Sequence, residues 1–381
     1  MNTAAWLQTA VLSGLVGCAP VIGEVTGIPT DTAAPHTDPP DECGAWDLPI
    51  LRGNGSYSGP DRYQICLDID DADTCPTGES ALFAVRERVG SPEDPDFCWY
   101  DISDVCGPVQ LDDTPCCFAA QVEVMCEGRP LSTDAGARTA ALQEGAGWSG
   151  QTQILGDLSP EQAGAAATHW RNVALAEHAS IASFARVVLE LCALGAPADL
   201  VTDAVRAQAD EVRHSKLAFS LLSEASGTAI TPGPLRLDDL QIRTEARQIL
   251  RATILEGCIN ETLSAAEVKE SAERCTHPAL AHHLRDVAID EARHASLAWR
   301  TVSWLIEQHP ELRDEAKEIV RAHLARPVSP TQRADRSAHA HRIGSLRPAE
   351  RQAIFDHVDA QVIRRAAERV LGPIEDLCAA A

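Results

Sequence analysis

The pattern Asp-Glu-x-Arg-His occurs twice in this chain, at residues 210–214 and again at residues 290–294. Each copy continues in a similar way, with Ser-Lys-Leu-Ala-Phe after the first and Ala-Ser-Leu-Ala-Trp after the second. Both copies lie in a segment rich in Ala, Leu, Glu and Arg, in which apolar residues recur at the 3.6-residue spacing of a helix. A repeated motif in such a segment restricts the fold to helices that bring the two copies together.

A glutamate precedes each copy of the motif at nearly the same distance. Glu177 lies 34 residues before Glu211, and Glu256 lies 35 residues before Glu291. The matched spacing indicates that one helical hairpin occurs twice in the chain.

Capping and breaking residues divide this segment into four long helices. Ser159, Pro160 and Gln162 supply an N-cap, a proline at the first helical position and a capping-box partner. We expect helices at 160–194, 197–226, 238–275 and 278–308. Two tight hairpins joined by one long connection are typical of a four-helix bundle with a crossover. The predicted fold class is mainly α, with the bundle at 159–310 and a helical extension at 311–381.

The paired motifs and their upstream glutamates have the composition of a metal site. Residues three apart on a helix share one face, so each Glu-x-x-His directs a carboxylate and an imidazole at the same point. Such a donor set suits iron or manganese. Four buried carboxylates would repel one another strongly, whereas two divalent ions cancel their charge. The candidate ligands are Glu177, Glu211, His214, Glu256, Glu291 and His294.

Residues 160–308 resemble the ferritin-like di-metal carboxylate superfamily. The Asp-Glu-x-Arg-His form is similar to that of soluble acyl-carrier-protein desaturases and related oxygen-activating di-iron proteins. The resemblance implies two iron ions, or two manganese ions, as cofactors. It also implies that Glu211 and Glu291 can bridge the two ions, that each imidazole binds one ion, and that the upstream glutamates are terminal ligands.

The remaining motif residues are expected around the ligands. The resemblance implies that Asp210 and Asp290 accept hydrogen bonds from the imidazoles and so fix their tautomers. Arg213 and Arg293 are expected to orient these aspartates.

One terminal ligand has an alternative. Glu261 follows Glu256 by five residues, which places it about 140° around the helix. Its height along the helix, measured from the turn at 276–278, is equally suitable for a metal ligand. The register of the repeat favours Glu256, and Glu261 remains the alternate ligand.

The cysteines indicate a second, different region. Eight of the 13 cysteines lie within residues 43–126, and no Cys-x-x-Cys occurs. A dense, even-numbered cluster without zinc-type spacing predicts a disulfide framework and an oxidising compartment. We expect a small disulfide-rich β module at 43–130, followed by a linker at 131–158. Cys192 and Cys275 both lie near expected helix turns and could form a further pair.

The N-terminus resembles a bacterial lipoprotein signal peptide. Leu15, Val16, Gly17 and Cys18 form a lipobox-like sequence after a short apolar run, and Ala19 resembles an outer-membrane address. The first eight residues carry no Lys or Arg, which departs from that pattern. We expect a signal peptide at 1–18, lipidation at Cys18, an extended linker at 19–42 and a lipid-anchored protein of the bacterial cell envelope. An ordinary signal peptide or a buried apolar segment is the alternative.

Composition narrows the function. A net charge of −24 disfavours nucleic acid as a partner. All three tyrosines precede the helical segment, which argues against a tyrosyl radical there. The sequence favours an oxidase, oxygenase, ferroxidase or peroxide scavenger, with O₂ or peroxide and a small-molecule substrate or Fe(II) as reactants. The alternative is a non-catalytic surface lipoprotein with a structural metal, whose cysteine-rich module binds a partner.

The lipidation hypothesis predicts the behaviour of one variant. Cys18→Ser removes the thiol that would accept the lipid, so a membrane-fractionating protein should become soluble or remain unprocessed. Detergent partitioning and intact mass measure this. Unchanged partitioning together with an unchanged mass would reject the anchor.

Overall fold

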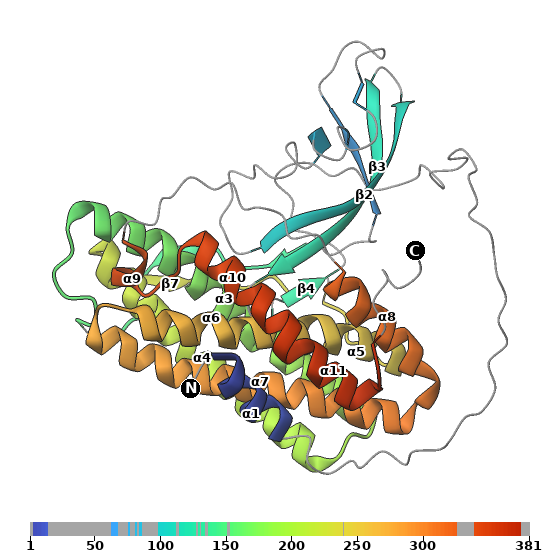
Figure 1. The fold of residues 1–381 in the computed structure, drawn as a ribbon. Helices are drawn as coiled ribbons and strands as arrows, with labels where there is room; N and C mark the ends of the chain where they lie inside the picture. Colours follow the sequence, from blue (N-terminus) through green and yellow to red (C-terminus); the bar gives the residue numbers. More distant parts are fainter. Residues whose placement is uncertain are drawn as a thin grey trace, which may run out of the picture.

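The computed structural model is mainly helical, with a small number of strands before the long helices (Figure 1). The residues that it describes are 3–13, 62–67, 75–76, 81, 84–85, 98–111, 114–126, 129, 131–133, 136–150, 153–238, 240–325 and 339–374. The proposed lipidation site Cys18 and the linker at 19–42 lie outside them.

The first two long helices form a tight hairpin. Helix α3 spans Pro160–Ala193, and helix α4 spans Ala198–Ser226. The capping box predicted for α3 is present, because the Ser159 side chain accepts from the Gln162 backbone and the Gln162 side chain accepts from the Ser159 backbone. Gly227 ends α4 with a φ of 69°, a conformation that glycine adopts without steric cost.

The second hairpin is less regular than the sequence predicts. Its first arm begins at Ala246 instead of near residue 238 and consists of α5 (Ala246–Ala252), a π-helical segment η2 (Thr253–Ile259) and α6 (Asn260–Arg274). Helix α7 (Pro278–Gln308) is the second arm. The π segment changes which face of the arm its later side chains occupy, because each extra residue rotates them by about 100°.

The two hairpins pack against each other through α4 and α7. Phe184, Phe219 and Trp299 are among the largest side chains with almost no exposed surface, and they fill the space between the long helices. Helices α3, α4, α6 and α7 lie side by side, with one motif on α4 and the other on α7 (Figure 1).

The C-terminal residues cover the second hairpin. After the 3₁₀ turn η3 (Pro310–Leu312) come α8 (Arg313–Leu324), α9 (Ala340–Ile343), α10 (Pro348–Val358), the π-helical η4 (Asp359–Ile363) and α11 (Arg364–Leu371). Val358, Val362 and Ile363 join the core cluster that also contains Trp299.

The N-terminal helix α1 (Thr3–Ser13) packs on α6, α7 and η4. Leu7 and Val11 are fully buried there, and Thr3 donates to Glu270 at 2.6 Å. The structure thus shows these residues as a buried apolar segment. Within the described parts of the chain, no helix is sufficiently long and apolar to span a bilayer.

The cysteine-rich region contains the expected strands. Strands β1 (Arg62–Cys66), β3 (Thr114–Cys126) and β2 (Cys98–Leu111) form an antiparallel sheet in the order β1-β3-β2. Disulfides Cys66–Cys117 and Cys75–Cys116 join β1 and the residues after it to β3. The side chains of Cys43, Cys98, Cys106 and Cys126 lie outside the described parts of the chain.

Cys192 and Cys275, whose pairing the sequence leaves open, are both free thiols.

The segment at 131–158, which the sequence predicts to be a linker, contains short strands. The segment forms β4 (Leu131–Thr133), β5 (Gly136–Arg138) and β6 (Leu142–Glu144), and β6 pairs with β7 (Ile230–Pro232) in the connection after α4. The Glu224 carboxylate at the end of α4 accepts backbone N–H bonds from Ile154, Leu155 and Gly156 at 2.8–2.9 Å. These bonds fix the segment to the first hairpin.

The contacts of Glu224 predict a stability effect. Glu224→Ala leaves three backbone N–H groups without their charged acceptor, so the free energy of unfolding should fall by about 2 kcal/mol. Chemical denaturation of samples with equal metal content measures this. The matched control, Glu318→Ala, alters an exposed residue of α8 and should change it by less than about 0.5 kcal/mol. Equal effects of the two substitutions would show that the contact does not fix the segment.

Candidate metal centre

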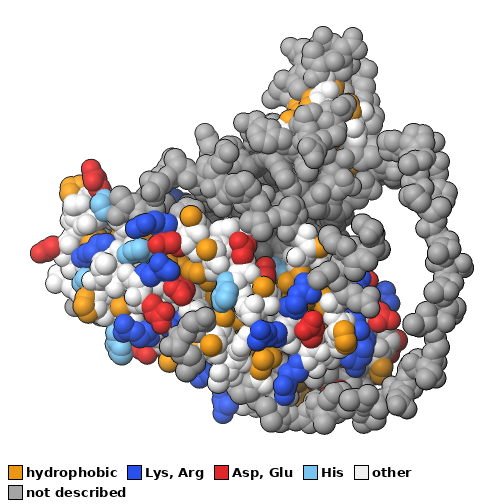
Figure 2. Space-filling view, in the orientation of Figure 1, with side chains coloured by type: hydrophobic (Ala, Val, Ile, Leu, Met, Phe, Trp, Pro, Cys, Tyr) orange, Lys and Arg blue, Asp and Glu red, His pale blue; other side chains and the backbone are white. Residues whose placement is uncertain are grey.

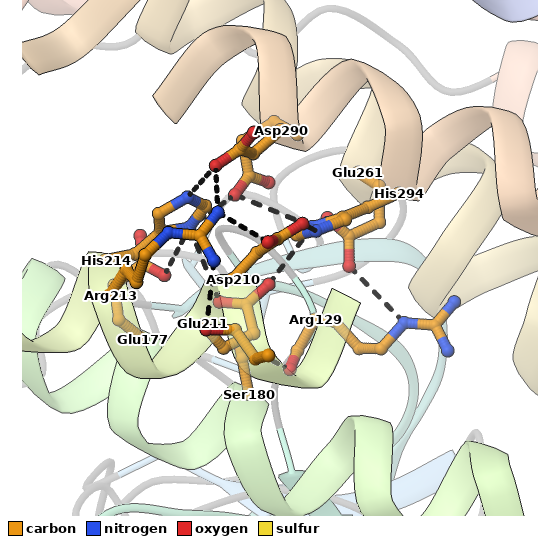
Figure 3. A network of polar contacts seen from close by, with 12 residues as sticks. Arg129, Glu177, Ser180, Asp210, Glu211, Arg213, His214, Glu261, Asp290 and His294 are labelled. Carbon is orange, nitrogen blue, oxygen red and sulfur yellow. Dashed lines mark hydrogen bonds and ion pairs between the residues drawn. The ribbon is translucent and has the colours of Figure 1, made fainter. Parts of the chain in front are cut away.

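Six buried or half-buried side chains from four helices meet between the two hairpins (Figure 3). Two groups among the described residues could each hold a metal ion, with ligand atoms that lie within 4.8 Å of one another. The first group takes Glu177 from α3, Glu211 and His214 from α4, and Glu291 from α7; the second takes Glu261 from α6, and Glu291 and His294 from α7. Glu291 belongs to both groups, so the two positions are adjacent.

The two motif glutamates lie between the two imidazoles. Glu291 Oε1 is 3.2 Å from His214 Nδ1 and 3.8 Å from His294 Nδ1. Glu211 directs Oε1 to His294 Nδ1 at 3.1 Å and Oε2 to His214 Nδ1 at 3.8 Å. Both carboxylates are therefore placed to contact ions at both positions.

The motif aspartates hold the imidazoles crosswise between α4 and α7. His214 Nε2 lies 3.1 Å from Asp290 Oδ2, and His294 Nε2 lies 3.3 Å from Asp210 Oδ2. Because a carboxylate only accepts, Nε2 carries the proton in each pair, and Nδ1 is the nitrogen that faces the glutamates. The aspartates thereby select the tautomer that a metal ion requires.

The motif arginines link the two aspartates. Arg213 donates to Asp210 at 2.5 Å and to Asp290 at 3.0 Å. Arg293 donates to Asp210 at 3.1 Å and also contacts Asp290. The four side chains form one ion-pair network across the α4–α7 interface, on the side of the imidazoles away from the glutamates (Figure 3).

Three buried ligand-type atoms of the cluster have no hydrogen-bond partner. They are His214 Nδ1, His294 Nδ1 and Glu261 Oε2. Buried polar atoms are nearly always paired, and an unpaired one costs about 1–3 kcal/mol. All three atoms belong to the two ligand groups, so bound cations would satisfy them, and the donor set of carboxylate oxygen and imidazole nitrogen fits iron or manganese.

The preference for Glu256 over Glu261 requires correction, because the structure brings Glu261 to the cluster. Glu256 lies in the π-helical segment η2 and pairs with Arg186 at 2.9 Å and Arg243 at 3.2 Å. Burial alone would raise the pKa of Glu256, but these two arginines outweigh burial and lower it. The repeat register assumed a uniform α-helix, and the π segment breaks that register.

Arg129 is a residue of the centre that the sequence does not indicate. It follows β3, lies almost fully buried, and places Nε 3.3 Å from Glu261 Oε1. Its guanidinium lies over the Phe184 ring at 4.9 Å, and its carbonyl accepts from Ser180 at 2.9 Å. No motif surrounds this arginine, so only the tertiary structure reveals its position.

Without metal, protons compensate much of the buried charge. Burial would lower the pKa of both histidines, but the surrounding carboxylates outweigh it: they raise the pKa of His214 well above its usual value and that of His294 to about 10. Burial, followed by the charge of a neighbouring glutamate, raises the pKa of Glu177 and Glu261. For Glu211, the attraction of the two imidazoles, at 3.1 Å and 3.8 Å from its oxygens, outweighs burial and lowers the pKa.

A cavity of about 70 Å³ adjoins the cluster. Glu177, Glu211 and Glu291 line one side of it, and its apolar wall includes Trp170, Leu217 and Leu284. Because of its size, the cavity can accept a diatomic molecule, peroxide or a very small organic compound beside the carboxylates.

No family model, no curated protein and no solved structure matches this chain. The assignment of the centre therefore rests on its own geometry.

The raised pKa values predict that metal binding releases protons. At pH 7 the metal-free protein holds a proton on His294, whose pKa is raised to about 10, and the raised pKa values of His214, Glu177 and Glu261 favour further bound protons. Such protons must leave when ions bind. Calorimetric titration with Mn(II), in buffers of different ionisation enthalpy, should therefore show a net release of protons.

The raised pKa of His294 also determines the direction in which metal affinity changes with pH. Protonated His294 stabilises the folded, metal-free protein. This stabilisation is complete below about pH 6.5, the pKa of histidine in the unfolded chain, and it is lost as the pH rises through the folded-state pKa of about 10. Metal affinity should therefore rise with pH between these values, because the competing proton is lost. Binding without proton release and with pH-independent affinity would contradict the shifts.

Proposed function

We propose that this chain is an exported ferritin-like di-iron, or di-manganese, protein that reacts with O₂ or peroxide. The observation that carries the proposal is the pair of ligand groups that share Glu291 at the centre of four helices. The proposed class is an oxidoreductase: an oxidase or oxygenase acting on a small molecule, or a ferroxidase or peroxide scavenger.

The helix arrangement supports the ferritin-like class. Each hairpin contributes one Glu-x-x-His helix and one helix with a single glutamate: α4 and α3 in the first, α7 and α6 in the second. The connection from residue 227 to residue 245 joins the two hairpins, and the short strand β7 is its one regular element among the residues that the structure describes. This is the ligand distribution and connectivity of the di-metal bundles.

Charge supports two ions over one. The cluster contributes four glutamates, Glu177, Glu211, Glu261 and Glu291, while Asp210 and Asp290 are already paired with the motif arginines. Two divalent cations balance the four glutamates, whereas a single ion leaves a buried excess of negative charge.

The protein side chains position the reactants and exclude water. Iron bound in these positions supplies the electrons that reduce O₂ or peroxide. Phe184 contacts the His294 ring edge-on with a centroid distance of 5.0 Å, and the cavity lining includes the apolar side chains of Trp170, Leu217 and Leu284. Asp210 and Asp290 hold the imidazole Nε2 atoms, so they would keep the Nδ1 atoms directed at bound ions.

Export and anchoring are part of the proposal. The two disulfides of the β module are typical of proteins in an oxidising compartment. A lipid at Cys18 would hold the protein at the membrane, and cleavage before Cys18 would remove α1 and uncover the apolar surface that Leu7 and Val11 now cover. The face of the described helical region seen in Figure 2 carries acidic and basic side chains that are interspersed, without a basic patch.

The function is tested by loading the full chain with Fe(II) without oxygen and then mixing it with O₂ or hydrogen peroxide. About two ions per chain should bind, and ferric absorbance should appear faster than free Fe(II) oxidises in the same buffer. Glu211→Ala/Glu291→Ala should lose most of the metal, because both groups lose a shared carboxylate. Asp210→Asn should keep metal but slow the reaction by about 10–100-fold.

Glu273→Ala, in an exposed position of α6, is the matched control and should behave as the unmodified protein. A loaded protein that is inert to both oxidants would favour the non-catalytic, structural-metal alternative. Unchanged metal content in the double variant would reject the site itself.

A further inference from the structure

We propose that Arg129 makes the two metal positions unequal. In this inference, which rests on the proposed function, Arg129 is a positioning residue: its guanidinium holds one oxygen of Glu261 and weakens cation binding at the position formed by Glu261, Glu291 and His294. The position formed by Glu177, Glu211, His214 and Glu291 should then fill first.

The Glu261 carboxylate directs its two oxygens at different groups. Its Oε1 lies 3.3 Å from Arg129 Nε, and its Oε2 faces His294 Nδ1 at 3.9 Å without a hydrogen-bond partner. Only one oxygen of Glu261 is therefore directed at the metal position (Figure 3). Glu177, the corresponding residue of the first hairpin, directs Oε2 to His214 Nδ1 at 3.6 Å and has no arginine among its described ion-pair partners.

The charges around the centre balance without Arg129 once two divalent ions are bound. Two divalent ions neutralise the four glutamates of the cluster, and the motif aspartates and arginines balance one another. The nearby Glu190 and Glu256 are matched by Arg186 and Arg243. Arg129 therefore adds a positive charge beyond neutrality once both ions are present, and its repulsion acts mainly on the ion beside Glu261 because Coulomb energy falls with distance.

The fold leaves a recess for the Arg129 guanidinium beside Gly257. A Cβ at Gly257 would lie 2.0 Å from Arg129 Nη2 and 2.6 Å from Ala298 Cβ, so only glycine leaves this space. Gly257 belongs to the π-helical segment η2, just before α6 carries Glu261 to the centre. The irregular helix thus creates both the recess for Arg129 and the register of Glu261.

The position of Arg129 in the chain connects the cysteine-rich module with the metal centre. The residue lies between β3, which is joined by disulfides to β1 and to Cys75, and β4, which packs on α3. Ser180 of α3 donates to its carbonyl at 2.9 Å. The cysteine-rich module therefore supplies one cation to the interior of the helical region, which gives the module a role in setting metal occupancy.

The test is stepwise Mn(II) binding to the full chain without oxygen, by equilibrium dialysis, with electron paramagnetic resonance at one ion per chain. The unmodified protein should bind two ions in separate steps, and at one ion per chain it should show mainly the signal of isolated Mn(II). Arg129→Met removes the charge, so the second ion should bind about tenfold more tightly, and spin-coupled pairs should appear at one ion per chain.

Three further variants separate charge from packing. Arg129→Lys keeps the charge and should retain the stepwise binding, whereas Arg129→Gln keeps polarity without charge and should behave as Arg129→Met. The matched control Arg300→Met removes an arginine that pairs with Asp203 at 2.6 Å, outside the centre, and should bind as the unmodified protein does. Circular dichroism confirms folding of each variant.

The outcomes distinguish the two proposals. If the unmodified protein takes up no metal, the proposed function fails and this inference fails with it. If the unmodified protein binds two ions but Arg129→Met and Arg129→Gln leave the ratio of the two affinities unchanged, or weaken the second ion, only the role of Arg129 is overturned.

Discussion

The burial of four carboxylates and two imidazoles at one point is the constraint on which the helical region depends. Each of α3, α4, α6 and α7 contributes at least one of these side chains, and burial prevents water from compensating them. The structure compensates them in other ways: aspartates hold the imidazole Nε2 atoms, arginines hold the aspartates, and protons or cations must balance the glutamates. The two hairpins can therefore pack together only when the charge of the centre is compensated.

The sequence predicts those parts of the structure that local chemistry determines. The capping box at Ser159 and the proline at the first position of α7 suit the starts of helices, where backbone N–H groups lack partners within the helix, and the structure confirms these starts. The i, i+3 spacing of Glu211 and His214 places both on one helical face, because helical periodicity requires it. These features need no knowledge of distant parts of the chain.

Other features depend on tertiary contacts that no local pattern encodes. A π-helical segment has no distinctive composition, so the sequence favoured Glu256 where the structure brings Glu261 to the cluster. Arg129 reaches the centre only because Gly257 leaves space for it across 128 residues of sequence. The strand β6 exists because it pairs with β7, and its polar sequence Leu-Gln-Glu resembles a linker.

The repeat of the motif does not make the two halves of the centre alike. Both hairpins present a Glu-x-x-His pair and a single glutamate from the other helix, but the second has an arginine from outside the helices against that single glutamate. Short π-helical segments occur frequently at functional sites, and burying an arginine has a desolvation cost. In our account, their contribution is the difference between the two metal positions.

The central claim is that two metal ions lie between Glu291 and the two imidazoles. A crystal of the full chain loaded with Fe(II), with diffraction recorded on both sides of the iron absorption edge, tests it most directly. The account predicts two anomalous peaks, one beside His214 Nδ1 and one beside His294 Nδ1, with Glu291 contacting both. Peaks confined to the protein surface, or an iron-loaded crystal with no peak among these residues, would contradict it.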